Sequence, residues 1–288
     1  MKILITGSNG LLGQKLLHKL RKDYFVELIA TSKGGNRVTD RSNYTYFDLD
    51  ITNNDAVAKL IESEKPQVVI NTAAMTNVDL CEDRKNACDA LNIDAHLIQI
   101  STDFIFDGED GPYTEEDIPN PLSYYGLSKL KSEQLLQAHS VKWTILRTII
   151  VFGVGEKLNR GNIVLWAKGA LEKGDSLNII DDQFRAPTLA EDLADICILA
   201  AKKKALGIFN ASGKDIMSIY EIVERIAKHY GNSIDNLNKI STATLNQKAV
   251  RPPKTGFILD KSRKELGYNP HSFEESLVII DEQLKIID

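Results

Sequence analysis

Cysteine is scarce in this chain, which has three residues of that type and no CxxC pair. An odd and sparse set argues against a disulfide framework. Cys81 and Cys88 are spaced so that on a helix they would share one face, as packed thiols do, and Cys197 is far from both. We therefore expect a reducing compartment, with the cytoplasm as the location.

Long apolar runs and a strong net charge are also missing. No stretch reaches the about 18 apolar residues that a membrane-spanning helix needs, so we expect no membrane association. A net charge of −5 means that the chain has no overall excess of positive charge to attract nucleic acid. We therefore do not expect nucleic acid as a partner. The start, Met1–Ile5, predicts a strand in place of a signal or transit peptide.

Metal-binding patterns are absent as well. The five histidines are scattered without an HExxH motif. Six acidic residues between 107 and 117 lack the ligand order of an EF-hand, and we expect them to form a solvated loop over a site. We expect no metal site.

What the sequence does contain is an alternation of short apolar runs with segments of helical periodicity. This alternation predicts an α/β fold built from right-handed βαβ units, with a doubly wound parallel sheet covered by helices on both faces. Strands are expected at 2–6, 25–31, 67–72, 96–101 and 142–148, with a weaker one at 43–47. Helices are expected at 11–22, 53–64, 80–94 and 123–139.

The later part of the chain is less regular. Loops around 153–162 and 181–187 are rich in Gly, Pro and Asn and could carry the chain into a smaller lobe. Helices are expected at 161–173, 188–204, 217–230, 261–266 and 272–287, with one more strand at 206–210.

One junction does not fit the pattern. The helical stretch that ends near Ala95 runs into the strand at His96 without a visible turn, although a crossover helix needs one at each end. Either the helix stops near Leu91 and 92–95 form the loop, or residues next to Ala95–His96 are missing or disordered.

A glycine motif, Thr6–Gly13, follows the first strand directly and opens a helix. That context favours a Rossmann-type dinucleotide site over a glycine-rich turn without a ligand. Gly7 would permit the tight turn, Gly10 the approach of the pyrophosphate, and Gly13 close packing of the helix on the sheet. The helix N-terminus then presents unpaired N–H groups to the phosphates.

A second motif places Tyr125 and Lys129 one helical turn apart, so that phenol and ammonium lie on one helix face. A nearby ammonium stabilises a phenolate, which makes the pair a candidate general acid/base for a carbonyl–alcohol interconversion. Tyr124 has Ser128 four residues on and no lysine, so Tyr125 is the better candidate.

A third motif, Ser101-Thr102-Asp103, ends the fifth expected strand. In an open α/β sheet, ligands bind beyond the carboxyl ends of the strands. A hydroxyl there can stabilise charge on a substrate carbonyl oxygen, although a strand-end turn capped by its own hydroxyl is the plain alternative.

Taken together, the segments TGSNGLLG, NTAAMTNVD, ISTDFIFDG, YYGLSK, LRT and DDQFRAPTLAEDLA resemble dTDP-4-dehydrorhamnose reductases of the extended short-chain dehydrogenase/reductase family. The resemblance implies reduction of the 4-keto group of a dTDP-linked 6-deoxyhexose. It also implies a Rossmann domain of 1–152 plus about 186–215, and a nucleotide-sugar-binding lobe of about 153–185 and 216–288. Nothing in the sequence names the sugar or the oligomeric state, for which a homodimer is our working assumption.

The resemblance assigns roles to individual residues. Thr102 and Asp103 would contact the sugar, Tyr125 would deliver the proton, and Lys129 would hold Tyr125 and the nicotinamide ribose. The cofactor would be lined by Gly10, Leu11, Leu12, Asp48, Leu49, Ala73 and Ala74. Arg251, which precedes Pro252 and Pro253, would belong to the nucleotide-sugar side.

Several positions depart from the family pattern. Many members have a tryptophan in the sugar pocket where this chain has Ile150, and the stretch 254–260 is slightly longer than usual. Some members bind magnesium between subunits through a glutamate where this chain has Lys15. The reaction type is unaffected by these departures, but the sugar is left open.

The end of the second strand indicates the cofactor. NAD-specific sites usually carry Asp or Glu there, to bind the ribose 2′-hydroxyl. Here Ser32 and Lys33 follow the strand, with Arg37 next and no acid among them, so these three residues could accommodate a 2′-phosphate. We expect NADPH in preference to NADH; a solvated basic loop is the alternative.

Two other functions share these features. A nucleotide-sugar epimerase would use the same Thr102, Tyr125 and Lys129. A binding module is the rival from another class, because relatives of this fold serve as regulatory subunits of methionine adenosyltransferase and keep the cofactor site. The intact set of three side chains favours an enzyme.

Overall fold

The computed structural model describes residues 1–73, 95–139, 141–158, 161–245 and 248–287. Within these ranges the largest sheet has seven strands, all paired in parallel, in the order β11-β6-β5-β4-β1-β2-β3. The strands are β1 (Lys2–Thr6), β2 (Glu27–Ser32), β3 (Thr45–Asp48), β4 (Val68–Asn71), β5 (His96–Thr102), β6 (Trp143–Thr148) and β11 (Gly207–Asn210). The chain starts at β1 and winds outward in both directions, which confirms the expected doubly wound sheet.

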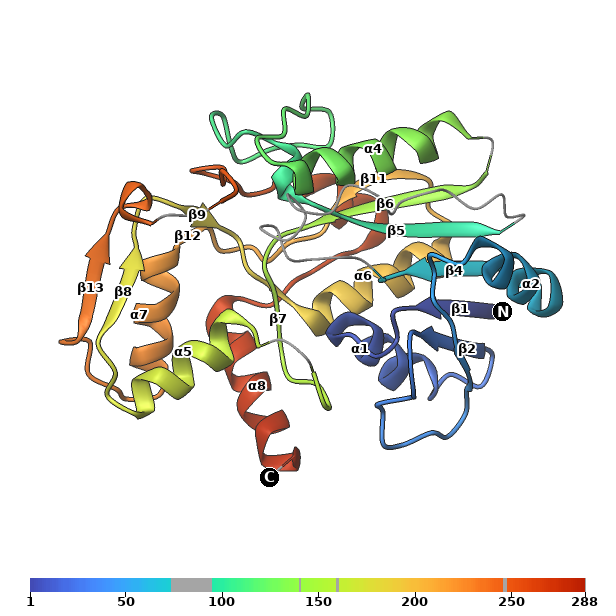
Figure 1. The fold of residues 1–288 in the computed structure, drawn as a ribbon, viewed down its shortest axis with the longest axis horizontal. Helices are drawn as coiled ribbons and strands as arrows, with labels where there is room; N and C mark the ends of the chain where they lie inside the picture. The colour runs from blue at the N-terminus through green and yellow to red at the C-terminus, as the bar shows by residue number, and fades with distance from the viewer. Residues whose placement is uncertain (74–94, 140, 159–160, 246–247, 288) are drawn as a thin grey trace.

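Helices cover both faces of this sheet, because successive strand side chains point to opposite sides. Ile3 and Ile5 join a core with α1 (Leu11–Leu20) and α6 (Ala190–Lys203). Leu4, between them in sequence, joins the opposite core with α2 (Asn54–Glu64) and α4 (Tyr124–Ala138). Figure 1 shows α4 above β5 and β6, α6 below these two strands, and α1 beside β1 and β2.

A smaller unit with its own apolar core lies beside the sheet (Figure 1). It is built from α5 (Ile163–Glu172), α7 (Ile219–His229) and α8 (Phe273–Ile287). Short strands pair at and near it: β7 (Val151–Phe152) with β10 (Thr188–Leu189), β8 (Leu177–Ile180) with β13 (Leu237–Ile240), and β9 (Phe184–Arg185) with β12 (Met217–Ser218). These pairs were not expected from the sequence, because β7, β9, β10 and β12 have only two residues each and the partners are distant in the chain.

One stretch differs from the expected division into domain and lobe. Phe257, Leu259, Leu266 and Tyr268 are buried in the core between the sheet and α6, not in the core of the smaller unit. The Tyr268 hydroxyl donates to the Ser212 carbonyl at 2.9 Å. Residues 257–268, which include the short helix η3 (Ser262–Leu266), therefore pack as part of the larger unit.

The boundaries of the other expected elements agree with the structure to within two or three residues. The helix expected at 80–94 and the shared face of Cys81 and Cys88 lie outside the described residues, as does the chain leading into Ala95–His96. No helix among the described residues is long and apolar enough to cross a membrane.

Candidate active site

The glycine loop joins β1 to α1 in the conformation that the motif predicts. Gly7 has φ +70°, a left-handed conformation that favours glycine. Gly10 is the N-cap of α1, and its N–H donates to the Gly7 carbonyl at 2.9 Å. A Cβ at Gly13 would clash with that same carbonyl. The first turn of α1, which includes Leu11 and Leu12, is thus held against the loop as a cradle for phosphates.

Hydrogen bonds connect this loop to the neighbouring strand ends. Thr6 Oγ1 donates to Asn71 Oδ1 at 2.5 Å, and Asn71 Nδ2 donates to Gln99 Oε1 at 2.7 Å. A Cβ at Gly7 would lie 2.7 Å from the backbone nitrogen of Ala73. Ala73 therefore lies where a cofactor-lining residue is expected, and Ala74 is outside the described residues.

The second and third strands end side by side, with Ser32 opposite Asp48. Asp48 Oδ1 accepts from the Gly34 N–H at 2.7 Å. Lys33 forms an ion pair with Asp50, 2.7 Å between Nζ and Oδ2. Asp48 was expected to line the cofactor, whereas Asp50, in the turn after β3, was not singled out from the sequence. The parallel pairing of β2 and β3 brings both carboxylates to the end of β2.

Arg37 and Leu49 lie close to the same edge. The Arg37 N–H donates to Asn9 Oδ1 in the glycine loop at 2.9 Å, and its guanidinium donates to the Lys157 carbonyl at 3.3 Å. Leu49 is buried, and its N–H donates to the Ser32 carbonyl at 3.0 Å. The loop that follows β2 is therefore fastened to the glycine loop.

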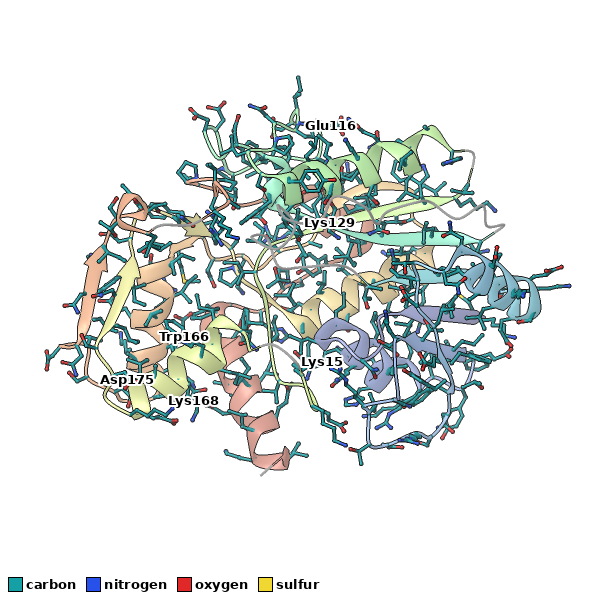
Figure 2. All side chains as sticks on the ribbon, in the orientation of Figure 1. Lys15, Glu116, Lys129, Trp166, Lys168 and Asp175 are labelled. Atoms are coloured by element: carbon teal, nitrogen blue, oxygen red, sulfur yellow. The ribbon has the colours of Figure 1, made fainter. Side chains whose placement is uncertain are left out.

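The helix α4 begins at its N-cap Ser123, whose hydroxyl accepts from the Gly126 N–H at 3.2 Å. Tyr125 and Lys129 are both buried, and Lys129 Nζ donates to the Ile100 carbonyl of β5 at 3.2 Å. Figure 2 shows Lys129 between α4 and β5. The two predicted catalytic side chains of α4 thus face the strand that carries the third motif.

That strand ends at Thr102, which caps the short 3₁₀ helix η1 (Asp103–Ile105). Thr102 Oγ1 accepts from the Phe104 N–H at 3.3 Å. The Phe104 ring meets the Tyr125 ring edge to face at 5.8 Å. Glycine at 126 permits this approach, because a Cβ there would overlap the Phe104 carbonyl oxygen. Thr102, Tyr125 and Lys129 therefore lie on elements that pack together at the C-terminal end of β5.

Asp103 has partners for both carboxylate oxygens within the protein. Oδ1 accepts from Thr102 Oγ1 at 3.1 Å, and Oδ2 accepts from Thr255 Oγ1 at 2.5 Å. Arg185 Nε lies 3.7 Å from Oδ2. Burial raises the pKa of Asp103, whereas Arg185, Thr255 and Thr102 act in the opposite direction. Sequence reasoning did not single out Arg185 or Thr255, since an isolated Arg or Thr in a loop gives no signal.

Arg251 and the two prolines after it lie close to the same centre. The Arg251 guanidinium donates to the Ala249 carbonyl at 3.3 Å. A Cβ at Gly108, in the loop after η1, would lie 2.8 Å from Pro252 Cβ. The segment expected on the nucleotide-sugar side is therefore adjacent to the expected catalytic loop.

The acidic loop after η1 is partly as expected. Glu116 and Asp117 are exposed, and Figure 2 shows Glu116 at the outer edge of the molecule. Glu115 is half-buried, and its Oε1 accepts from the Asn210 N–H at 2.8 Å. One of the six acids thus fastens the loop to β11.

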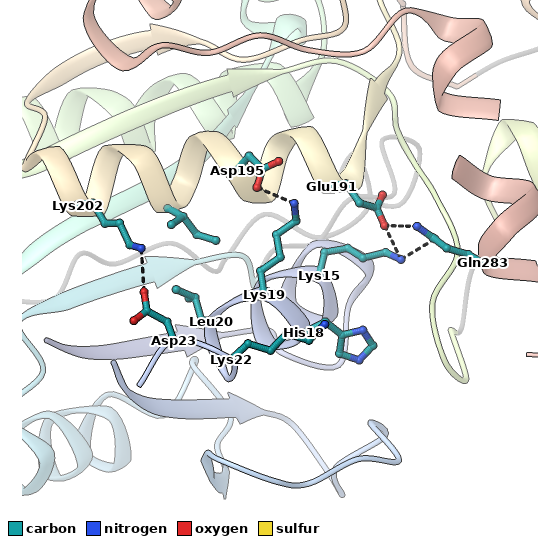
Figure 3. A pocket seen from close by; sticks show the side chains of 11 residues that line it. Lys15, His18, Lys19, Leu20, Lys22, Asp23, Glu191, Asp195, Lys202 and Gln283 are labelled. Carbon is teal, nitrogen blue, oxygen red and sulfur yellow. Dashed lines mark hydrogen bonds and ion pairs between the residues drawn. The ribbon is translucent and has the colours of Figure 1, made fainter. Parts of the chain in front are cut away.

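A pocket of about 520 Å³ lies between α1, α6 and α8 (Figure 3), and none of the predicted catalytic residues lines it. Lys15 Nζ lies 2.7 Å from Glu191 Oε1 and 2.8 Å from Gln283 Oε1. Lys15 therefore places an ammonium in this pocket. The described part of the chain contains no group of three or more potential metal ligands.

Comparison with known proteins places these features in a family. The model described as "RmlD substrate binding domain" matches residues 1–285. A dTDP-4-dehydrorhamnose reductase of Aggregatibacter actinomycetemcomitans is 31% identical, over 96% of this chain and 97% of that protein. Methionine adenosyltransferase 2 subunit beta of Danio rerio is also 31% identical, over 92% and 84%.

Solved structures show the same fold. A dTDP-4-dehydrorhamnose reductase of Clostridium acetobutylicum is 31% identical with a TM-score of 0.82, over 99% of this chain and 100% of that one. A dTDP-4-dehydrorhamnose reductase of Bacillus anthracis in complex with NADP is 24% identical with a TM-score of 0.80, over 98% and 99%.

Proposed function

The chain belongs to the RmlD substrate binding domain family, and on that premise we propose that it reduces the 4-keto group of a dTDP-linked 6-deoxyhexose with NADPH. On this proposal dTDP-4-dehydrorhamnose is converted to dTDP-L-rhamnose. The observation that supports the proposal is the packing of α4, which carries Tyr125 and Lys129, against the end of β5, which carries Thr102, two strands from the glycine loop.

The glycine loop supports a dinucleotide cofactor, since Gly7 and Gly13 allow the loop, the first turn of α1 and the end of β4 to pack closely together, and the N-terminus of α1 can then bind phosphates. When bound there, NADPH supplies a hydride. Thr102 releases its hydrogen bond to Asp103 Oδ1 and donates to the substrate carbonyl oxygen instead, which stabilises the negative charge that develops on that oxygen. Tyr125 gives that oxygen its proton, and Lys129 stabilises the phenolate that remains.

Asp103 and Arg251 have less direct roles in this proposal. Asp103 is 2% exposed and engaged by Thr102 and Thr255, so it holds the catalytic loop in place. Arg251 provides a cation for the diphosphate of the sugar nucleotide. The sparse cysteines support a cytoplasmic enzyme. We retain a homodimer as a prediction that sedimentation velocity would test.

Cofactor preference gives a first prediction. Replacing Lys33 and Arg37 together with alanine should weaken NADPH binding about tenfold to a hundredfold, as expected for lost hydrogen bonds to a charged phosphate, and should spare NADH. Fluorescence titration with both cofactors measures the change. An equal loss for NADPH and NADH would mean that the basic loop only supports the fold.

The proposed activity is tested by NADPH oxidation with a panel of 4-keto sugar nucleotides. We expect oxidation coupled to formation of a nucleotide-linked 6-deoxyhexose that carries a 4-hydroxyl group. Interconversion of 4-epimers without net NADPH consumption would favour an epimerase. The similarity to methionine adenosyltransferase 2 subunit beta makes a regulatory protein the second candidate. Cofactor binding without turnover of any sugar nucleotide would favour that candidate.

A further inference from the structure

Arg185 of β9 is among the largest fully buried side chains in the described structure, with 1% of its surface exposed. Its guanidinium donates to the Pro252 carbonyl at 2.6 Å, the Phe184 carbonyl at 2.7 Å and the Pro253 carbonyl at 3.3 Å. Removing a guanidinium from water is costly unless it is paired and hydrogen-bonded. These acceptors supply the hydrogen bonds, and two of them belong to the segment expected on the nucleotide-sugar side.

The paired charge comes from the catalytic loop. Arg185 Nε lies 3.7 Å from Asp103 Oδ2, and the guanidinium lies over the Phe104 ring at 5.7 Å. Thr255 completes the cluster, because its hydroxyl donates to the same Asp103 oxygen at 2.5 Å. One buried cation therefore joins the loop that carries Thr102 to the segment 252–255.

We propose that Arg185 is a positioning residue of the active site, whose guanidinium fixes Thr102 relative to the segment 252–255 by holding Asp103 and the two proline carbonyls at once. The inference rests on the proposed reductase function for its catalytic consequence. In the proposed reaction Arg185 contacts neither the substrate carbonyl nor the cofactor. It acts through Asp103.

The charge of Arg185 is needed as well as its hydrogen bonds. Burial raises the pKa of Asp103, and Arg185 is the largest opposing influence. Burial lowers the pKa of Arg185 itself, an effect that Asp103 opposes and Arg251 adds to. The titratable groups that α4 places beside this loop are Tyr125 and Lys129. Without Arg185, Asp103 would therefore take up a proton at higher pH than in the unmodified protein.

Arg185→Gln tests the inference. We expect kcat/KM for the keto-sugar nucleotide to fall about 10²-fold, the effect of misplacing a catalytic group by about 1 Å. We also expect a new loss of activity as pH decreases, because a protonated Asp103 no longer accepts from both Thr102 and Thr255. NADPH affinity should be unchanged, since the glycine loop is elsewhere, and it serves as the test of correct folding.

Three further variants identify the cause. Arg185→Lys keeps the cation and should show no acid limb, with a smaller loss of kcat/KM. Asp103→Asn combined with Arg185→Gln should show no acid limb either, because the titrating group is gone. Arg225→Gln is the matched control, since Arg225 forms ion pairs with Glu221 and Glu274 near the surface of α7 and should leave all parameters unchanged.

Hydrogen exchange tests the same inference without relying on turnover. In Arg185→Gln, backbone amides of 100–106 and of 254–258 should both exchange faster than in the unmodified protein. Faster exchange in only one segment, or an acid limb that persists in the double variant, would overturn the inference. Absence of turnover in the unmodified protein would instead refute the proposed function, and the exchange experiment would still decide the role of Arg185.

Discussion

Replacing Tyr125 with phenylalanine is expected to lower turnover about 10²–10⁴-fold, the range that general acid–base catalysis typically contributes. The substitution removes one oxygen and leaves the ring, which packs against Phe104, in place. NADPH affinity should change little, because in the proposed function the glycine loop and Lys129 make most of the contacts with the cofactor. Steady-state kinetics with a keto-sugar nucleotide measure the first quantity, and a cofactor titration the second.

Tyr124→Phe is the matched control for this experiment. Tyr124 precedes Tyr125 on α4, but its neighbour one turn on is Ser128, whose hydroxyl donates to the Tyr125 carbonyl at 2.8 Å. The control should therefore retain near-normal turnover. If Tyr124→Phe abolished activity while Tyr125→Phe retained it, the assignment of the proton donor would be off by one residue. If neither variant lost activity, the proposed catalytic set would be wrong.

Replacing Gly126 with alanine should damage the protein through packing alone. The added Cβ would overlap the Phe104 carbonyl oxygen, a backbone atom that cannot move without displacing η1. Overpacking of this kind costs about 1–3 kcal/mol of unfolding free energy, or more. Since η1 follows Thr102 and Gly126 follows Tyr125, turnover should fall as well. Chemical denaturation and steady-state kinetics measure the two effects.

Gly169→Ala is the matched control for this variant, and we expect it to leave stability and turnover intact. Gly169 also lies within a helix, α5, but a Cβ there meets no atom within 4 Å. Alanine is the better helix former by about 0.5–1 kcal/mol, so this variant should be slightly more stable and fully active. If Gly126→Ala behaved in the same way, α4 would have room to move away from η1, contrary to the packing described.

The larger unit could be predicted from the sequence because its elements are long and periodic. Buried parallel strands such as β1 and β6 appear as short apolar runs, and α4 is marked by its cap Ser123 and the Tyr125–Lys129 pair. The strand pairs β8–β13 and β9–β12 could not be predicted. Their partners are distant in the chain, and β9 and β12 have only two residues each.

The residues of the candidate site likewise divide into those that the sequence could identify and those that it could not. Residues in a local motif, such as Gly13 or Lys129, were identifiable because one segment of chain contains both the residue and its context. The sequence did not identify three residues of the site, because their roles depend on partners from other strands and loops: Arg185, Thr255 and Asp50. Asp103 was identified by its position at a strand end, but its engagement by Arg185 and Thr255 follows only from the fold.

The packing of residues 257–268 against α6 bears on how the protein can be shortened. A fragment that ended near residue 215 would contain all seven strands of the large sheet, yet it would lack Phe257, Leu259, Leu266 and Tyr268. The surface that these side chains cover would then face water, and the fragment would be prone to aggregate. We therefore expect that the larger unit does not fold as an autonomous module. Expression trials and domain-exchange designs need to retain the C-terminal segment through Tyr268.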